Sequence, residues 1–209
     1  VDTAFDVGQM KIGRRLAMKL LNASKFVLAN RAAGTPVSEV LDRGMLSRLA
    51  ALVAESTRAL DDYDYTRALM TTETFFWECC DDFVELVKAR RYGDFGADAA
   101  GSAETTVEAA LRVMLRLFAP YLPFVTDEVW SWWQPGSVHT ASWPTTEEIL
   151  VLAAEPGDAA TLAVAVDVTA GFRDSVMHVG HELVEVDAGL GFEIDALEKQ
   201  IHQHRFAAS

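Results

Sequence analysis

Apolar residues recur every three or four positions along most of the first 133 residues, which is the pattern of amphipathic α-helices. The clearest case is the segment from about residue 10 to residue 30, where one apolar face repeats at helical spacing and would pack on a core. That face consists of Leu16, Leu20, Ala23 and Val27. The run Gly-Thr-Pro at residues 34–36 follows and predicts the end of this helix.

The same periodicity predicts four further helices, over residues 42–62, 65–91, 106–119 and 123–133. The expected start signals are Ser38 or Asp42 for the first, Asp64 for the second, Thr105 with Glu108 for the third and Pro123 for the fourth. Between the second and third of these helices, residues 92–103 are rich in Gly, Ala and Asp and predict a loop. Helices joined by short connections predict an antiparallel helical bundle, mainly α in class, over residues 1–144.

Residues 145–209 have a different composition, with 12 acidic and 3 basic residues and four of the five histidines of the chain. Apolar residues alternate from Leu162 to Val168 as in a strand, but the alanine-rich context also fits a helix over residues 158–177. The sequence leaves both interpretations open. We therefore expect a small C-terminal appendage, or linker, of α or α+β structure.

Charge is distributed unevenly along the chain. The protein carries 18 basic and 31 acidic residues, a net charge of −13, yet residues 9–38 contain six basic residues and no acidic one. The rest of the chain therefore carries −19, which is −13 minus +6. A concentrated basic helix in an acidic protein indicates either a local contact with a polyanion or a solvated helix face.

Four residues of the basic segment form a second stripe beside its apolar face. Arg15, Lys19, Asn22 and Phe26 recur at steps of four, three and four. A phenylalanine on a basic and polar stripe can stack on an unpaired base while cations hold phosphate, as in proteins that recognise single-stranded RNA loops. The alternative is that Phe26 packs under a neighbouring helix.

Residues typical of catalysis or metal binding do not converge in the sequence, and we predict no catalytic and no metal site. His178 and His181 have the spacing of two metal ligands on one helix face, but a third ligand is not identifiable and surface histidines are the alternative. The adjacent Cys79 and Cys80 are geometrically unsuited to a mutual disulfide and read as small buried side chains. No apolar run approaches the ~20 residues that span a bilayer, so we expect no membrane partner.

Several segments resemble the motifs of one family, both in their residues and in their order along the chain. They are DTAFDVGQMKIGRRLAMKLLNASKFVLAN, LDRGMLSRLAAL, FFWECCDDFVELVK and LRLFAPYLPFVTDEVWSWW. Together they are similar to the anticodon-binding domain of bacterial valyl-tRNA synthetases, especially the actinobacterial form, over about 140 of the 209 residues. The resemblance implies the helical bundle of class I synthetases, which grips the anticodon loop of tRNA.

The resemblance also implies roles for particular residues. In similar synthetases the Lys and Phe of a K-x-x-N-A-x-x-F element lie at the anticodon loop, and the Phe stacks on an anticodon base; these positions are Lys19 and Phe26 here. Val84 and Glu85 match the contact region on the third helix of the family. Where family members carry an Arg near the start of the first helix, this chain has Gly8. That departure leaves basic neighbours as candidates for the contact, namely Lys11, Arg14 and Arg15.

The resemblance implies that the chain is a fragment of a larger cytoplasmic enzyme. A catalytic domain with HIGH and KMSKS signatures, which uses ATP and Mg²⁺ to charge valine-specific tRNA, and an editing domain would lie upstream. The fragment itself would need no cofactor, and its partner would be the tRNA. The family continues into a basic arm, whereas this tail has Arg173 followed by Asp174 where a basic run is expected. The acidic tail motivates an alternative, a non-catalytic protein-interaction module of the same ancestry.

Overall fold

The structure, a computed structural model, describes residues 7–29, 35–153 and 155, all of which lie in the first of two units of the chain, Val1–Thr169. The described residues are mainly helical, as predicted, and their only strand-like pairing is a single parallel bridge between Val37 and Ala153. In chain order the elements are α1 (Val7–Ala29), α2 (Val40–Asp61), α3 (Tyr65–Glu78), the π-helical segment η1 (Cys79–Phe83), α4 (Val84–Arg91), α5 (Ala97–Phe118), α6 (Pro123–Ser131), the 3₁₀ turn η2 (Val138–Thr140) and α7 (Thr146–Leu150).

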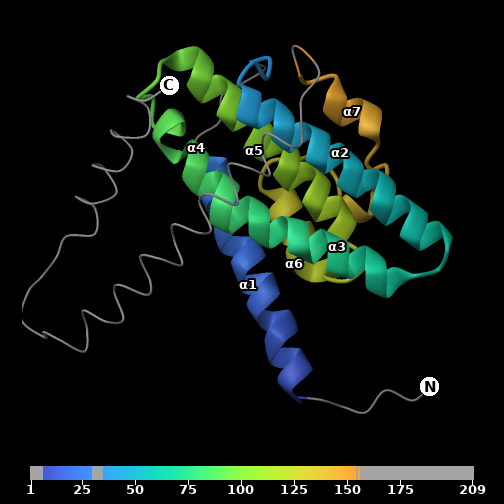
Figure 1. The fold of residues 1–209 in the computed structure, drawn as a ribbon. Helices are drawn as coiled ribbons and strands as arrows, with labels where there is room; N and C mark the ends of the chain where they lie inside the picture. The colour runs from blue at the N-terminus through green and yellow to red at the C-terminus, as the bar shows by residue number, and fades with distance from the viewer. Residues whose placement is uncertain (1–6, 30–34, 154, 156–209) are drawn as a thin grey trace, which may run out of the picture. The chain divides into compact units, whose positions relative to one another are not determined.

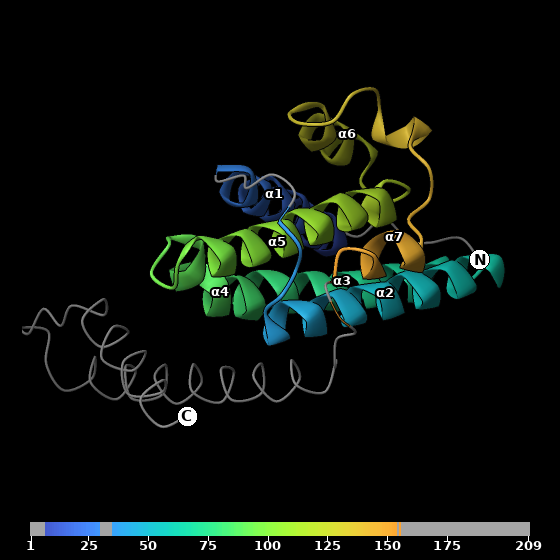
Figure 2. The ribbon, with the colours of Figure 1, turned by 90° about the horizontal axis from the view of Figure 1, so that it is seen from above.

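Helix α5 occupies the middle of this bundle. Figure 2 shows α1 and α6 on one side of α5, and α2, α3 and α4 on the other. In keeping with this position, 16 residues of α5 are buried. Small residues in α5 allow the neighbouring helices to approach closely. Helices α2 and α3 form an antiparallel pair joined by a short turn at residues 62–64 (Figure 1).

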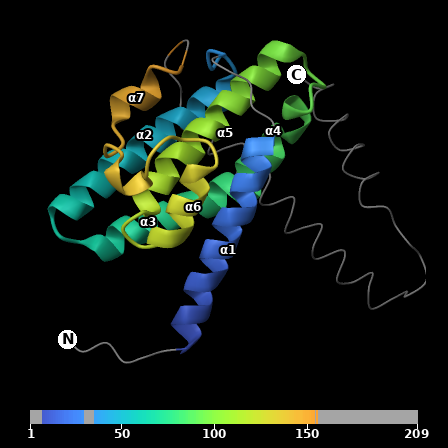
Figure 3. The same ribbon diagram turned by 180° about the vertical axis from the view of Figure 1, so that it is seen from behind.

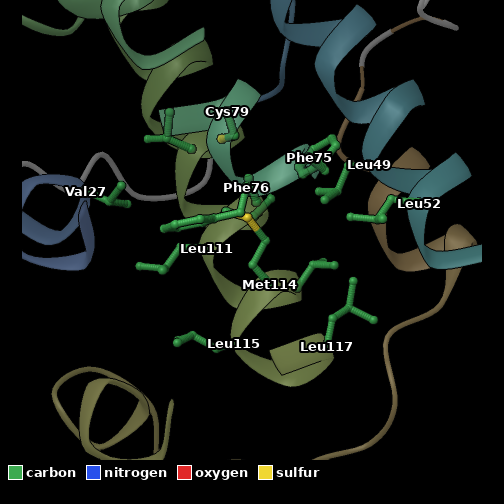
Figure 4. Packing of buried hydrophobic residues seen from close by; sticks show 14 of the residues in the cluster. Val27, Leu49, Leu52, Phe75, Phe76, Cys79, Leu111, Met114, Leu115 and Leu117 are labelled. Atoms are coloured by element: carbon green, nitrogen blue, oxygen red, sulfur yellow. The ribbon is translucent and has the colours of Figure 1, made fainter. Parts of the chain in front are cut away.

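The core gathers apolar side chains from α1, α2, α3 and α5 (Figure 4). Phe76 is fully buried, and its ring meets that of Phe118 edge to face at a centroid distance of 5.7 Å. Burial of such side chains is the main favourable term in folding. The labelled contributors are Val27 from α1, Leu49 and Leu52 from α2, Phe75 and Phe76 from α3, Cys79 from η1, and Leu111, Met114, Leu115 and Leu117 from α5.

Helix α1 presents the predicted apolar face to this core. Leu16, Leu20 and Val27 are buried, and Ala23 is partly buried against them. The N-terminal half of α1 extends past the other helices in Figures 1 and 3. Accordingly, Met10 is 60% exposed. The bundle therefore holds α1 from about Arg15 and Leu16 onward.

The predicted start signal of α2 was wrong, whereas Asp64 caps α3 as expected by accepting from the backbone N–H of Arg67. Helix α2 follows Glu39, whose side chain makes no capping bond. Asp42 is instead fully buried within the first turn, where it accepts two hydrogen bonds from Arg90, at 2.8 and 2.7 Å, and one from Ser102. A buried carboxylate needs such partners, and here they tie α2 to α4 and α5.

The start of α5 also differs from the prediction. The structure continues the helix back to Ala97, so the expected loop is confined to residues 92–96, and Thr105 lies inside the helix instead of capping it. The hydroxyl of Thr105 donates to the carbonyl of Thr35 at 2.9 Å. Small residues in this segment therefore serve close packing between α5 and the segment that precedes α2.

Gly101 gives a direct test of this close packing. A Cβ at Gly101 would lie 2.5 Å from Oγ1 and 2.8 Å from Cβ of Thr35. Gly101→Ala should therefore destabilise the fold by about 1–3 kcal/mol in urea unfolding. Gly13→Ala in α1 meets nothing within 4 Å and should instead stabilise by about 1 kcal/mol, the ordinary gain in a helix interior. Equal gains at both sites would contradict the packing.

The chain after α6 returns to α2. Pro123 begins α6, as predicted, and α7 is capped by Thr145, which accepts from the N–H of Glu148 at 3.3 Å. Arg116 of α5 forms an ion pair with Glu148, and Trp143 donates to Thr57 of α2 at 2.9 Å. Residues 146–150 therefore pack on α2, although the sequence assigned them to the appendage. The other structural expectations for residues 158–209 lie outside the described residues.

Candidate nucleic-acid interface

The predicted stripe lies along one face of α1, next to the face that packs on the core. Arg15 and Asn22 are exposed, whereas Lys19 and Phe26 are half-buried. Spacings of three and four residues place these side chains above one another on a helix. The stripe is therefore a continuous surface, and its half-buried members lean on the neighbouring helices.

Trp77 of α3 organises the two cations of the stripe. The guanidinium carbon of Arg15 lies 5.7 Å from the centre of the Trp77 ring, and Nζ of Lys19 lies 5.5 Å from it. The indole N–H donates to Glu73 at 3.2 Å, which fixes the orientation of the ring. Both distances are typical of cation–π contacts, so Trp77 holds the cations near the end of α3.

Lys19 also has a carboxylate partner. Its Nζ lies 2.5 Å from Oδ1 of Asp81 in the π-helical segment, and the two side chains are 36% and 39% exposed. An RNA phosphate that binds Lys19 must therefore compete with Asp81. At least one acidic side chain of this protein, Asp81, therefore contacts the basic stripe directly.

Phe26 lies at the other end of the stripe and meets Arg91. The guanidinium carbon of Arg91 is 4.6 Å from the centre of the Phe26 ring. The ring is also partly buried against the core cluster. Phe26 thus packs on its neighbours and keeps an exposed part, so its role as a stacking platform stays a prediction.

Val84 and Glu85 follow η1 on the same helical run. This run contacts α1 twice, where Asp81 pairs with Lys19 and where Arg91 lies over the Phe26 ring. Val84 and Glu85 lie between Asp81 and Arg91 in the chain. Val84 is only 7% exposed and belongs to the core. Glu85 is exposed and pairs with Lys88 at 3.3 Å. Of the two, Glu85 can offer its side chain to a ligand.

The π-helical segment was not predicted, since the periodicity indicated one helix over residues 65–91. Such segments shift the register of a helix by one residue and occur often at functional sites. Cys79 is buried in this segment and Cys80 is half-buried, and neither forms a disulfide. Burial raises the pKa of the Cys79 thiol, and it raises the pKa of Cys80 to about 12, with Asp81 adding to the shift and Lys19 opposing it. Both thiols stay protonated at neutral pH and are poor nucleophiles.

Residues that sequence reasoning missed hold the stripe in place. They are Trp77, Asp81, Arg91 and Glu104, of which Glu104 forms a buried ion pair with Arg91 at 2.8 Å. No local pattern marks them, because Lys19 and Asp81 are 62 residues apart in the sequence. Within residues 7–29, 35–153 and 155, no three potential metal ligands come together. His178 and His181 lie outside these ranges.

Comparison with known proteins assigns the class. Residues 42–177 match the family model of the anticodon-binding domain of tRNA ligases, so the chain belongs to this family. The predicted fold class, a mainly helical anticodon-binding bundle, is confirmed. The matched range begins in α2, so it does not include the stripe on α1.

The similar proteins are valine–tRNA ligases. The chain is 57% identical to that of Salinispora arenicola over 155 residues, which are 71% of this chain and 18% of that protein. It is 57% identical to that of Thermobifida fusca over 167 residues, or 78% and 19%, and 45% identical to that of Bifidobacterium longum over 171 residues, or 70% and 19%. The resemblance seen in the sequence is confirmed. The chain spans about a fifth of the length of these relatives, and no helix in its described part is long and apolar enough to cross a membrane.

Proposed function

We propose that this chain recognises the anticodon loop of valine tRNA as part of a valine–tRNA ligase. The observation that carries the proposal is the stripe on α1, where the two cations held by Trp77 and the half-buried side chain of Phe26 share one face. Cations can hold the phosphates of an unpaired loop while the aromatic ring stacks on a base. Membership in the anticodon-binding family supports the same ligand.

Within this proposal the residues divide the work. Arg15 and Lys19 bind phosphate, and Phe26 stacks on a base. Stacking tolerates every base, so discrimination must come from groups that form hydrogen bonds with base edges. Asn22 and Glu85 are exposed, and between them they offer a donor amide and carboxylate acceptors. We assign the reading of base identity to these two side chains.

The remainder of the ligase would supply the chemistry. Its catalytic domain would activate valine with ATP and Mg²⁺ and transfer it to tRNA in the cytoplasm, and its editing domain would remove wrong products. Upstream domains of the same polypeptide are therefore the proposed protein partners. The chain described here would bind and orient the tRNA, with no catalytic residue and no cofactor of its own.

Binding to two RNAs of equal charge tests the proposal. A stem-loop with the valine anticodon in its unpaired loop should bind more tightly than an RNA of the same length in which the anticodon bases lie in a paired stem. The affinity should fall with added salt, with a slope of about −0.7 per neutralised phosphate of a single strand. Equal affinity for both RNAs would show a purely electrostatic contact and contradict the proposal.

Asp81 provides a second expected result. Asp81→Asn removes the carboxylate that competes with phosphate for Lys19, so stem-loop binding should become about two- to fivefold tighter, as expected for the loss of a half-exposed ion pair. Asp61→Asn, at the exposed end of α2, changes the net charge equally and should leave the affinity nearly unchanged. Fluorescence anisotropy measures both, and weaker binding by Asp81→Asn would contradict the competition.

A further inference from the structure

The guanidinium of Arg91 holds Phe26 in two places. Its Nη2 donates to the carbonyl oxygen of Phe26 at 3.3 Å and to that of Val27 at 3.1 Å. Its central carbon lies 4.6 Å from the centre of the Phe26 ring. One cation at the end of α4 therefore contacts both the backbone and the ring of the same residue on α1.

The backbone contacts cap α1. The helix ends at Ala29, so the carbonyls of Phe26 and Val27 belong to the last four, which have no partner within the helix. A positive charge is favourable at this end of a helix. Arg91 thereby fixes the backbone from which the Phe26 side chain departs.

Glu104 of α5 fixes the guanidinium itself. It accepts from Nε of Arg91 at 2.8 Å and from Nη2 at 3.1 Å, and the side chains are 1% and 6% exposed. Among the described residues Nη1 has no hydrogen-bond acceptor. The adjacent face of the Phe26 ring offers this buried cation its remaining favourable contact.

We infer that Arg91 is a positioning residue, which holds the ring of Phe26 in the orientation that stacks on an unpaired base. The inference rests on the proposed function and adds a residue to it. With one ring face on the guanidinium, a base stacks on the opposite face. The ring is fixed before RNA arrives, so binding costs less side-chain entropy. Lysine cannot replace this arrangement, since only the planar fork of arginine reaches a carboxylate, carbonyls and a ring face together.

A double-mutant cycle distinguishes positioning from a general structural role. Arg91→Lys should weaken stem-loop binding by about three- to tenfold when Phe26 is present, and by less than about twofold in a Phe26→Leu background. Equal losses in both backgrounds would overturn the inference, because Arg91 would then not act through the ring. The matched control is Arg90→Lys, which breaks a similar fork to buried Asp42 and should leave RNA affinity unchanged.

The wild-type protein provides a measurement that does not depend on the folding of variants. On titration with the stem-loop, the NMR resonance of the buried Arg91 Nε–H should shift, whereas that of Arg90 should not. A stem-loop that binds without shifting the Arg91 resonance would overturn this inference and leave the proposed function intact. No binding by the wild-type chain would overturn both.

Discussion

Replacing Glu104 with glutamine is expected to lower the free energy of unfolding by about 3–5 kcal/mol, as for other buried pairs that lose one partner. The Arg91 side chain is 1% exposed, and Glu104 supplies its only carboxylate partner among the described residues. Without the carboxylate a positive charge stays buried beside the last turn of α1. Urea unfolding followed by circular dichroism measures the loss.

The control for this change is Glu85→Gln. Glu85 also pairs with a cation, Lys88, but the two side chains are 53% and 43% exposed. Solvent screens such a pair, so the free energy of unfolding should change by less than about 1 kcal/mol. If Glu104→Gln cost as little as Glu85→Gln, the buried pair would not be the clamp that holds α1 to α4 and α5.

Replacing Phe26 with alanine is expected to weaken binding of the valine anticodon stem-loop by about 1–3 kcal/mol, or roughly five- to 150-fold. The ring is half-buried and lies on the Arg91 guanidinium, and the variant removes the surface on which we place an unpaired base. Isothermal titration calorimetry measures the affinity, and the melting temperature of the variant reports whether the fold survives.

Two variants separate stacking from packing. Phe26→Leu keeps apolar bulk against the core but lacks a ring, so it should still lose most of the affinity. Phe124→Ala removes a phenylalanine that is 89% exposed on α6 and is not a member of the stripe, and it should bind as the wild type does. Wild-type affinity in Phe26→Leu would show that the ring has no role in RNA recognition.

The helices could be predicted where the signal is local. Periodicity gave α1, α2 and the run from α3 to α4, because each buries one face on the same core. It did not give the start of α5, where Ala, Gly and Ser read as a loop. A small residue is needed at position 101 because Gly101 approaches Thr35 closely. This contact joins segments 66 residues apart in the sequence, at positions 35 and 101.

The candidate site was predictable only in part. The stripe on α1 follows from helical spacing and from the family resemblance, and both are visible in the sequence. Its supports are not, since Lys19 meets Asp81 and Phe26 meets Arg91 across the fold. Net charge also gave an incomplete picture. Asp42 and Glu104 count among the 31 acidic residues, but both are buried partners of arginines.

We propose above that this bundle reads the identity of anticodon bases. The most direct test of this proposal compares the valine anticodon stem-loop with one that differs only in the middle anticodon base. The two RNAs carry the same charge, so phosphate contacts contribute equally to both affinities. The changed stem-loop should bind clearly more weakly, and the difference should be smaller in Asn22→Ala. Equal affinities of the wild-type chain for the two stem-loops would contradict the proposal.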